Sequence, residues 1–79
     1  MIDVTTKKPL SVGLDRTGPY LDVTVSQLEA IRKLLDHHGV HYRVAEHAIS
    51  IDGGPEKTLI FFGRKGDSHA VQAILESVP

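Results

Sequence analysis

The sequence predicts a small α+β domain, a two-layer sandwich in which two helices cover one face of an antiparallel sheet. The first observation is the spacing of the apolar residues, which follows the period of a strand or of a helix in successive segments. This spacing gives the element order β-β-α-β-β-α. The second is that turn-forming residues separate the strands of each pair, which favours antiparallel hairpins. The third is that each helical segment carries one apolar stripe, so each helix packs on the sheet through one of its faces and exposes the other to solvent.

A β-hairpin is predicted over residues 10–25. Residues 10–14 alternate apolar and small side chains, residues 15–19 are turn formers, and residues 20–25 alternate with period two. The odd-numbered positions of the second strand are expected to face the core, and the even-numbered positions to face away from it. The residues expected in the core are Leu21, Val23 and Val25.

A helix is predicted to begin at Ser26, because Glu29 three positions later completes a capping box. Gly39 is expected to end this helix, since glycine favours the left-handed conformation that closes helices. The apolar stripe consists of Leu28, Ile31, Leu34 and Leu35.

The segment 41–51 is predicted to be one bent strand rather than two strands. Its apolar residues fall on even positions in the first half and on odd positions in the second half, so a bulge must change the face between them. They are Tyr42, Val44, Ile49 and Ile51.

Residues 57–62 are predicted to form the central strand, because they are apolar on both faces and follow a turn at 52–55. A last helix is then expected, capped by Asp67 or Ser68. Its buried stripe consists of Val71, Ile74, Leu75 and Val78.

This order of elements resembles a variant of the ferredoxin-like plait. In that scaffold a strand follows the second helix, whereas here the sequence stops after the helix, so the strand at 10–14 is expected to occupy the vacant edge. The resemblance concerns architecture and implies no function. Residues 1–9 are predicted to be a flexible N-terminal arm, and residues 10–79 a single α+β domain.

Charge and composition disfavour several classes of protein. Nine Lys and Arg against ten Asp and Glu leave a net charge of −1, without the positive excess of a protein that binds nucleic acid mainly through phosphates. The chain has no cysteine for a disulfide framework or a thiolate metal site. It has no apolar stretch near the roughly 18 residues that span a bilayer, and its start does not resemble a targeting segment. A soluble, cytoplasmic protein is expected.

A basic turn before the last helix is the candidate anion site. The turn combines two glycines, two cations and the N-terminus of a helix, whose amides and dipole favour an anion. The alternative is a solvated turn whose glycines serve geometry. The candidate residues are Gly63, Arg64, Lys65, Gly66 and Ser68.

The five histidines do not predict a metal site, because His37 and His38 point about 100° apart on a helix and Gly39 interrupts the spacing to His41. No nucleophile, base and acid converge, so no catalytic residue and no cofactor are predicted.

The candidate interface is the sheet face without helices. If Leu59 and Phe61 pack under the helices, their neighbours along the strand emerge on the other face, beside the tyrosines. A contiguous aromatic patch on a small domain marks association. The alternative is that the N-terminal arm covers the patch. The candidate residues are Tyr20, Tyr42, Ile60 and Phe62.

Together these features predict a non-catalytic interaction or regulatory module. It is expected to form a homodimer or to bind a protein partner, and to accept an anionic small molecule at residues 63–68. The alternative is a nucleic-acid-binding domain that uses the open face, which the near-neutral charge disfavours. Its stacking residues would be Tyr20, Tyr42 or Phe62, and its phosphate contacts Arg43, Arg64 and Lys65. A small enzyme with a site across a dimer interface is the third reading.

Overall fold

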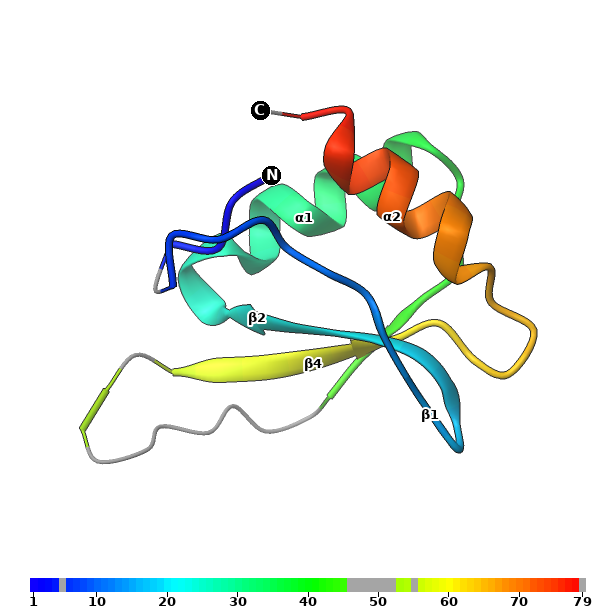
Figure 1. The fold of residues 1–79 in the computed structure, drawn as a ribbon, viewed down its shortest axis with the longest axis horizontal. Coiled ribbons are helices and arrows are strands. Elements are labelled where there is room, and N and C mark those ends of the chain that lie inside the picture. Colours follow the sequence, from blue (N-terminus) through cyan, green and yellow to red (C-terminus); the bar gives the residue numbers. More distant parts are fainter. Residues whose placement is uncertain (5, 46–52, 55, 79) are drawn as a thin grey trace.

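In the part of the chain that the structure describes, the residues form one four-stranded antiparallel sheet and two helices, which lie together on one side of the sheet (Figure 1). The computed structural model describes residues 1–4, 6–45, 53–54 and 56–78. The elements are β1 (Gly13–Asp15), β2 (Gly18–Thr24), α1 (Val25–His37), β3 (Arg43–Val44), β4 (Lys57–Phe61) and α2 (Ser68–Glu76). The α+β prediction is therefore confirmed at the level of an antiparallel sheet and two helices.

The strands lie in the order β1-β2-β4-β3. Strand β4 lies between β2 and β3 because α1 carries the chain from β2 to the far edge of the sheet, and the chain then returns along the middle. Strand β1 takes the free edge beside β2. The predicted bent strand at 41–51 is described only in its first part, as β3, and residues 46–52 lie outside the described residues.

A single hydrophobic core fills the space between the sheet and the helices. The apolar side chains of both helices and of the strands meet in one cluster, which explains why both helices cover the same face. Its buried members are Leu10, Leu21, Val23, Ile31, Leu35, Ile60, Phe62, Val71 and Leu75. Val25 was expected in this core, but it is the first residue of α1 and is 37% exposed.

Helix α1 begins at Val25, one residue before the predicted start. Its N-cap is Thr24, whose side chain caps no backbone N–H, so the capping box predicted at Ser26 and Glu29 is wrong. The C-terminus agrees with the prediction: the Gly39 N–H donates to Asp36 (3.1 Å) and the Val40 N–H to Leu35 (3.0 Å). These two hydrogen bonds form a Schellman motif.

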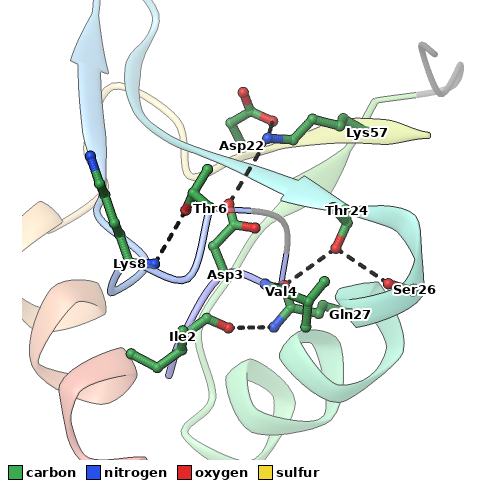
Figure 2. A network of polar contacts seen from close by, with 10 residues as sticks. All are labelled: Ile2, Asp3, Val4, Thr6, Lys8, Asp22, Thr24, Ser26, Gln27 and Lys57. Carbon is green, nitrogen blue, oxygen red and sulfur yellow. Dashed lines mark hydrogen bonds and ion pairs between the residues drawn. The ribbon is translucent and has the colours of Figure 1, made fainter. Parts of the chain in front are cut away.

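The N-terminal segment, predicted to be a flexible arm, lies against both helices. Gln27 of α1 accepts a hydrogen bond from the Val4 N–H (3.0 Å) and donates one to the Ile2 carbonyl (2.7 Å), as Figure 2 shows. The Met1 ammonium donates to carbonyls at the C-terminus of α2, and Asp3 is 7% exposed. Residues 1–4 therefore do not cover the other face of the sheet, which was the alternative considered for this arm.

Gln72 of α2 makes the same pair of bonds to the chain further on. It accepts a hydrogen bond from the Val12 N–H (2.8 Å) and donates one to the Leu10 carbonyl (3.1 Å). Each glutamine thus bonds residues i and i+2 of an extended segment, as a neighbouring strand would. The two glutamine side chains thus make the hydrogen bonds that the backbone of a neighbouring strand would make.

We expect Gln72→Ala to lower the free energy of unfolding by about 1–3 kcal/mol, because it leaves a partly buried N–H and a carbonyl without partners. Urea unfolding measures this loss, and hydrogen exchange at Val12 should become faster. Glu29→Ala, an exposed change on α1, is the control and should stay within about 0.5 kcal/mol of wild type. Equal stability of the two variants would contradict this role of Gln72.

Among the described residues, no helix has the length and the apolar character needed to cross a membrane.

Candidate functional site

The face of β4 that meets the helices is the opposite of the predicted one. Ile60 is 0% exposed and Phe62 is 7% exposed, whereas Leu59 and Phe61 are half-buried on the side away from the helices. The register explains this, because Ile60 lies opposite Leu21 and both belong to the core. Ile60 and Phe62 are therefore corrected from interface residues to core residues.

One sequence signal for the correct face was available in Lys57. Lys57 has the same parity as Leu59 and Phe61, and a lysine at the start of a strand indicates which face meets solvent. In the structure its ammonium lies 3.5 Å from the Asp22 carboxylate, which is exposed on that face.

We call the side of the sheet without helices the open face. A row of four paired residues crosses it, one from each strand: Gly13 of β1, Tyr20 of β2, Phe61 of β4 and Arg43 of β3. Directly paired residues lie on the same face, so the two rings are neighbours on the two central strands. The row therefore contains Tyr20, which the sequence predicted, and Phe61 and Arg43 in place of Ile60 and Phe62.

The Tyr20 ring lies across β1 at Gly13. A Cβ built on Gly13 would be 2.5 Å from the ring carbon Cζ, so the ring occupies the space where any other residue would place its side chain. The absence of a side chain at Gly13 allows this ring to lie on the strand, and aromatic residues often cover a glycine of a neighbouring strand in this way.

Arg43 lies over Phe61 at the other end of the row. Its guanidinium carbon is 4.9 Å from the centre of the ring, which is the geometry of a cation–π contact. Arg43 is exposed and Phe61 is half-buried. The guanidinium is therefore the outer surface of this pair.

Tyr42, the other tyrosine predicted at the interface, is directed to α1. Its hydroxyl donates a hydrogen bond to the Asp36 carboxylate (2.9 Å), and its ring packs against the core cluster. The hydrogen bond with Tyr42 is also the main cause that raises the pKa of Arg32 above its ordinary value. Tyr42 thus belongs to the helix side of the sheet.

A shallow hollow of about 410 Å³ opens where β3 begins and β4 ends. Its lining consists of Thr17, His41, Tyr42, Arg43, Phe61, Phe62 and Gly63, so it lies at the end of the sheet between the open face and the helix side. The turn between β1 and β2 reaches this end of the sheet because Gly18 packs on the backbone of Gly63 and Arg64. The hollow thus brings the row on the open face next to two surface turns.

The predicted anion turn is a tight turn that ends in a helix cap. The Gly66 N–H donates to the Gly63 carbonyl (3.0 Å), and the Asp67 carboxylate accepts from the Ala70 N–H (3.0 Å). Asp67 is therefore the N-cap of α2, one of the two residues predicted for that role. Its negative charge takes the position at the helix N-terminus where an external anion would bind.

No group of three or more His, Cys, Asp or Glu side chains within residues 1–4, 6–45, 53–54 and 56–78 is placed to hold a metal ion. The rings of His37 and His38 contact each other edge to face at 5.4 Å, at the C-terminus of α1.

No family model, no curated protein and no solved structure matches this chain.

Proposed function

We propose that this chain is a small non-catalytic binding module and that the open face of its sheet is the binding surface. The row from Gly13 to Arg43 supports this proposal, because it presents two aromatic rings and a guanidinium side by side on the face that no helix covers. Neighbouring aromatic side chains that are partly exposed on a small domain are typical of contact surfaces.

The proposed partner class follows from what this face presents. A second copy of the chain or another protein is the partner that the sequence predicts, and Leu59 and Phe61 provide apolar area for it. A separate anionic ligand at residues 63–68 is not part of the proposal, because such a ligand would compete with the Asp67 carboxylate at the helix N-terminus.

We also propose that the scaffold is a ferredoxin-like plait in which β1 replaces the strand that normally follows the second helix. The strand order β1-β2-β4-β3 supports this, with the two central strands antiparallel to each other and joined through a helix and an edge strand. In such a scaffold the two middle strands are β2 and β4, which carry the rings of Tyr20 and Phe61 on the open face.

The test of the binding surface compares Phe61→Ser with Leu14→Ser. Leu14 is 68% exposed and belongs to the alternate positions of β1, so Leu14→Ser also removes an exposed apolar side chain but leaves the open face unchanged. We expect sedimentation to detect a concentration-dependent dimer for the wild type and for Leu14→Ser, and a folded monomer for Phe61→Ser, whose circular dichroism should stay that of the wild type at the temperature of measurement. A wild type that stays monomeric and binds no oligonucleotide through this face would contradict the proposal.

A further inference from the structure

We infer that the row formed by Tyr20, Phe61 and Arg43 is a stacking platform for the bases of a single-stranded nucleic acid. This inference rests on the proposed function, since it uses the same open face as the binding surface and assigns to it a nucleic acid in place of a protein. The sequence disfavoured nucleic acid for its near-neutral charge, but the distribution of charge in the structure favours it.

The first support is the shape of the platform. The Tyr20 ring lies on Gly13, and the Arg43 guanidinium lies on the Phe61 ring. The exposed Arg43 guanidinium is therefore the outermost group over Phe61, and the half-buried Tyr20 ring lies beside this pair on the neighbouring strand. Unpaired bases stack on aromatic rings and on arginine planes in this way, and base–aromatic stacking tolerates any sequence because every base has a π-face.

The second support is the local charge at this end of the sheet. The turn between β1 and β2 contributes Arg16, β3 contributes Arg43, and the turn after β4 contributes Arg64 and Lys65. All four are exposed, and the contact of Gly18 with Gly63 and Arg64 holds the two turns together. Four of the nine lysines and arginines of the chain thus lie at one end of the sheet.

Three acidic groups near this end have hydrogen-bond partners. The Asp15 carboxylate accepts hydrogen bonds from the Thr17 hydroxyl (2.7 Å) and the Thr17 N–H (2.8 Å), which lower its pKa. The Asp67 carboxylate caps α2, and the Asp36 carboxylate accepts from the hydroxyl of Tyr42, which lines the hollow. Four cations against these three acids leave a small positive excess, which suits the phosphates of a strand whose bases lie on the platform.

The hollow supports a single strand over a duplex. It adjoins Phe61 and Arg43 at the end of the sheet and is shallow, with a volume of about 410 Å³. An unpaired base has a free face that can lie against such a surface, whereas the bases of a duplex are already stacked on one another.

The test is a fluorescence anisotropy titration of the full chain with a labelled single-stranded RNA of mixed sequence, with the duplex of the same sequence as a comparison. We expect saturable, salt-dependent binding of the single strand and weaker binding of the duplex. Arg43→Lys keeps the charge but removes the planar group, so it should weaken binding about tenfold without changing the salt dependence.

Three further variants separate stacking from charge. Gly13→Ala should lift the Tyr20 ring from the sheet and weaken binding severalfold, at little cost in thermal midpoint because the displaced group is the end of a side chain. Arg64→Ala should reduce the slope of log K against log salt by roughly 0.7. Lys33→Ala, an exposed change on α1, is the control and should bind as the wild type does.

Two results would overturn the inference: no saturable binding of the single strand at low salt, or an equal loss for Arg43→Lys and Lys33→Ala. If the RNA does not bind but Phe61→Ser abolishes a dimer, the inference falls and the proposed function stands. If the wild type neither dimerises nor binds RNA, both fall.

Discussion

Replacing Ile60 by alanine is expected to lower the free energy of unfolding by about 2–5 kcal/mol. Ile60 is 0% exposed, lies opposite Leu21 in the sheet, and packs in the core cluster between the sheet and the helices. A domain of 79 residues has a total stability of about 4–12 kcal/mol, so this one change removes a large part of it. Urea or thermal unfolding of the purified variant measures the loss.

Phe61→Ala is the matched control, because Phe61 is the next residue of the same strand and lies on the open face. It should cost about 1 kcal/mol, chiefly through the lost contact with Arg43 and the smaller area that the ring buries. The pair therefore tests which face of β4 meets the helices. A larger loss for Phe61→Ala than for Ile60→Ala would reverse the assignment.

Gly18→Ala is expected to destabilise the fold by about 2–6 kcal/mol. Gly18 has a φ of 108°, which non-glycine residues adopt only with strain of about 1–3 kcal/mol. In addition, the new Cβ would lie 2.3 Å from the Gly63 carbonyl oxygen and 3.0 Å from the Arg64 Cα. Both are backbone atoms, so the two turns must separate, at a further cost of about 1–3 kcal/mol.

Gly63→Ala separates strain from steric clash. Gly63 also has a positive φ, 76°, but a Cβ there would meet nothing within 4 Å. This variant should lose about 1–2 kcal/mol from the left-handed conformation alone. Chemical unfolding of both variants gives the difference, which reports the contact between the two turns. Equal losses would show that Gly18 and Gly63 are not in close contact in solution.

Local signals in the sequence predicted the elements that are built from local interactions. The stripe of α1, its end at Gly39 and the cap of α2 at Asp67 each depend on residues within one or two turns of helix. The hairpin depends on the turn formers between Asp15 and Gly18. These elements could therefore be derived without knowledge of the tertiary structure.

The orientation of β4 could not be derived in the same way. Residues 59–62 are all apolar, so alternation does not distinguish the two faces, and the choice depends on which residues of β2 lie opposite. The start of α1 was uncertain for a similar reason. Thr24 with Gln27 has the same capping-box spacing as Ser26 with Glu29, and the structure uses Gln27 for contacts with the N-terminal segment.

The sheet face without helices was predicted from the sequence, but not all the residues that lie on it. Tyr20 was placed correctly because its strand alternates cleanly. Arg43 was assigned a phosphate contact, but its position over Phe61 depends on the register of β3 with β4, which brings together residues that are far apart in the sequence. Tyr42 was misplaced because its hydroxyl bonds to Asp36, a contact that no alternation pattern contains.

Gln27 and Gln72 affect the order in which parts of the molecule unfold. Ile2, Val4, Leu10 and Val12 are attached through side chains of α1 and α2 and not through the ladder of the sheet. Detaching the described residues 1–4 and 6–12 breaks these contacts and the ion pair between Asp3 and Lys57 of β4 (3.9 Å), but no pairing of the four-stranded ladder. We expect this part of the chain to open before the ladder does and to expose Leu10 to water when it opens.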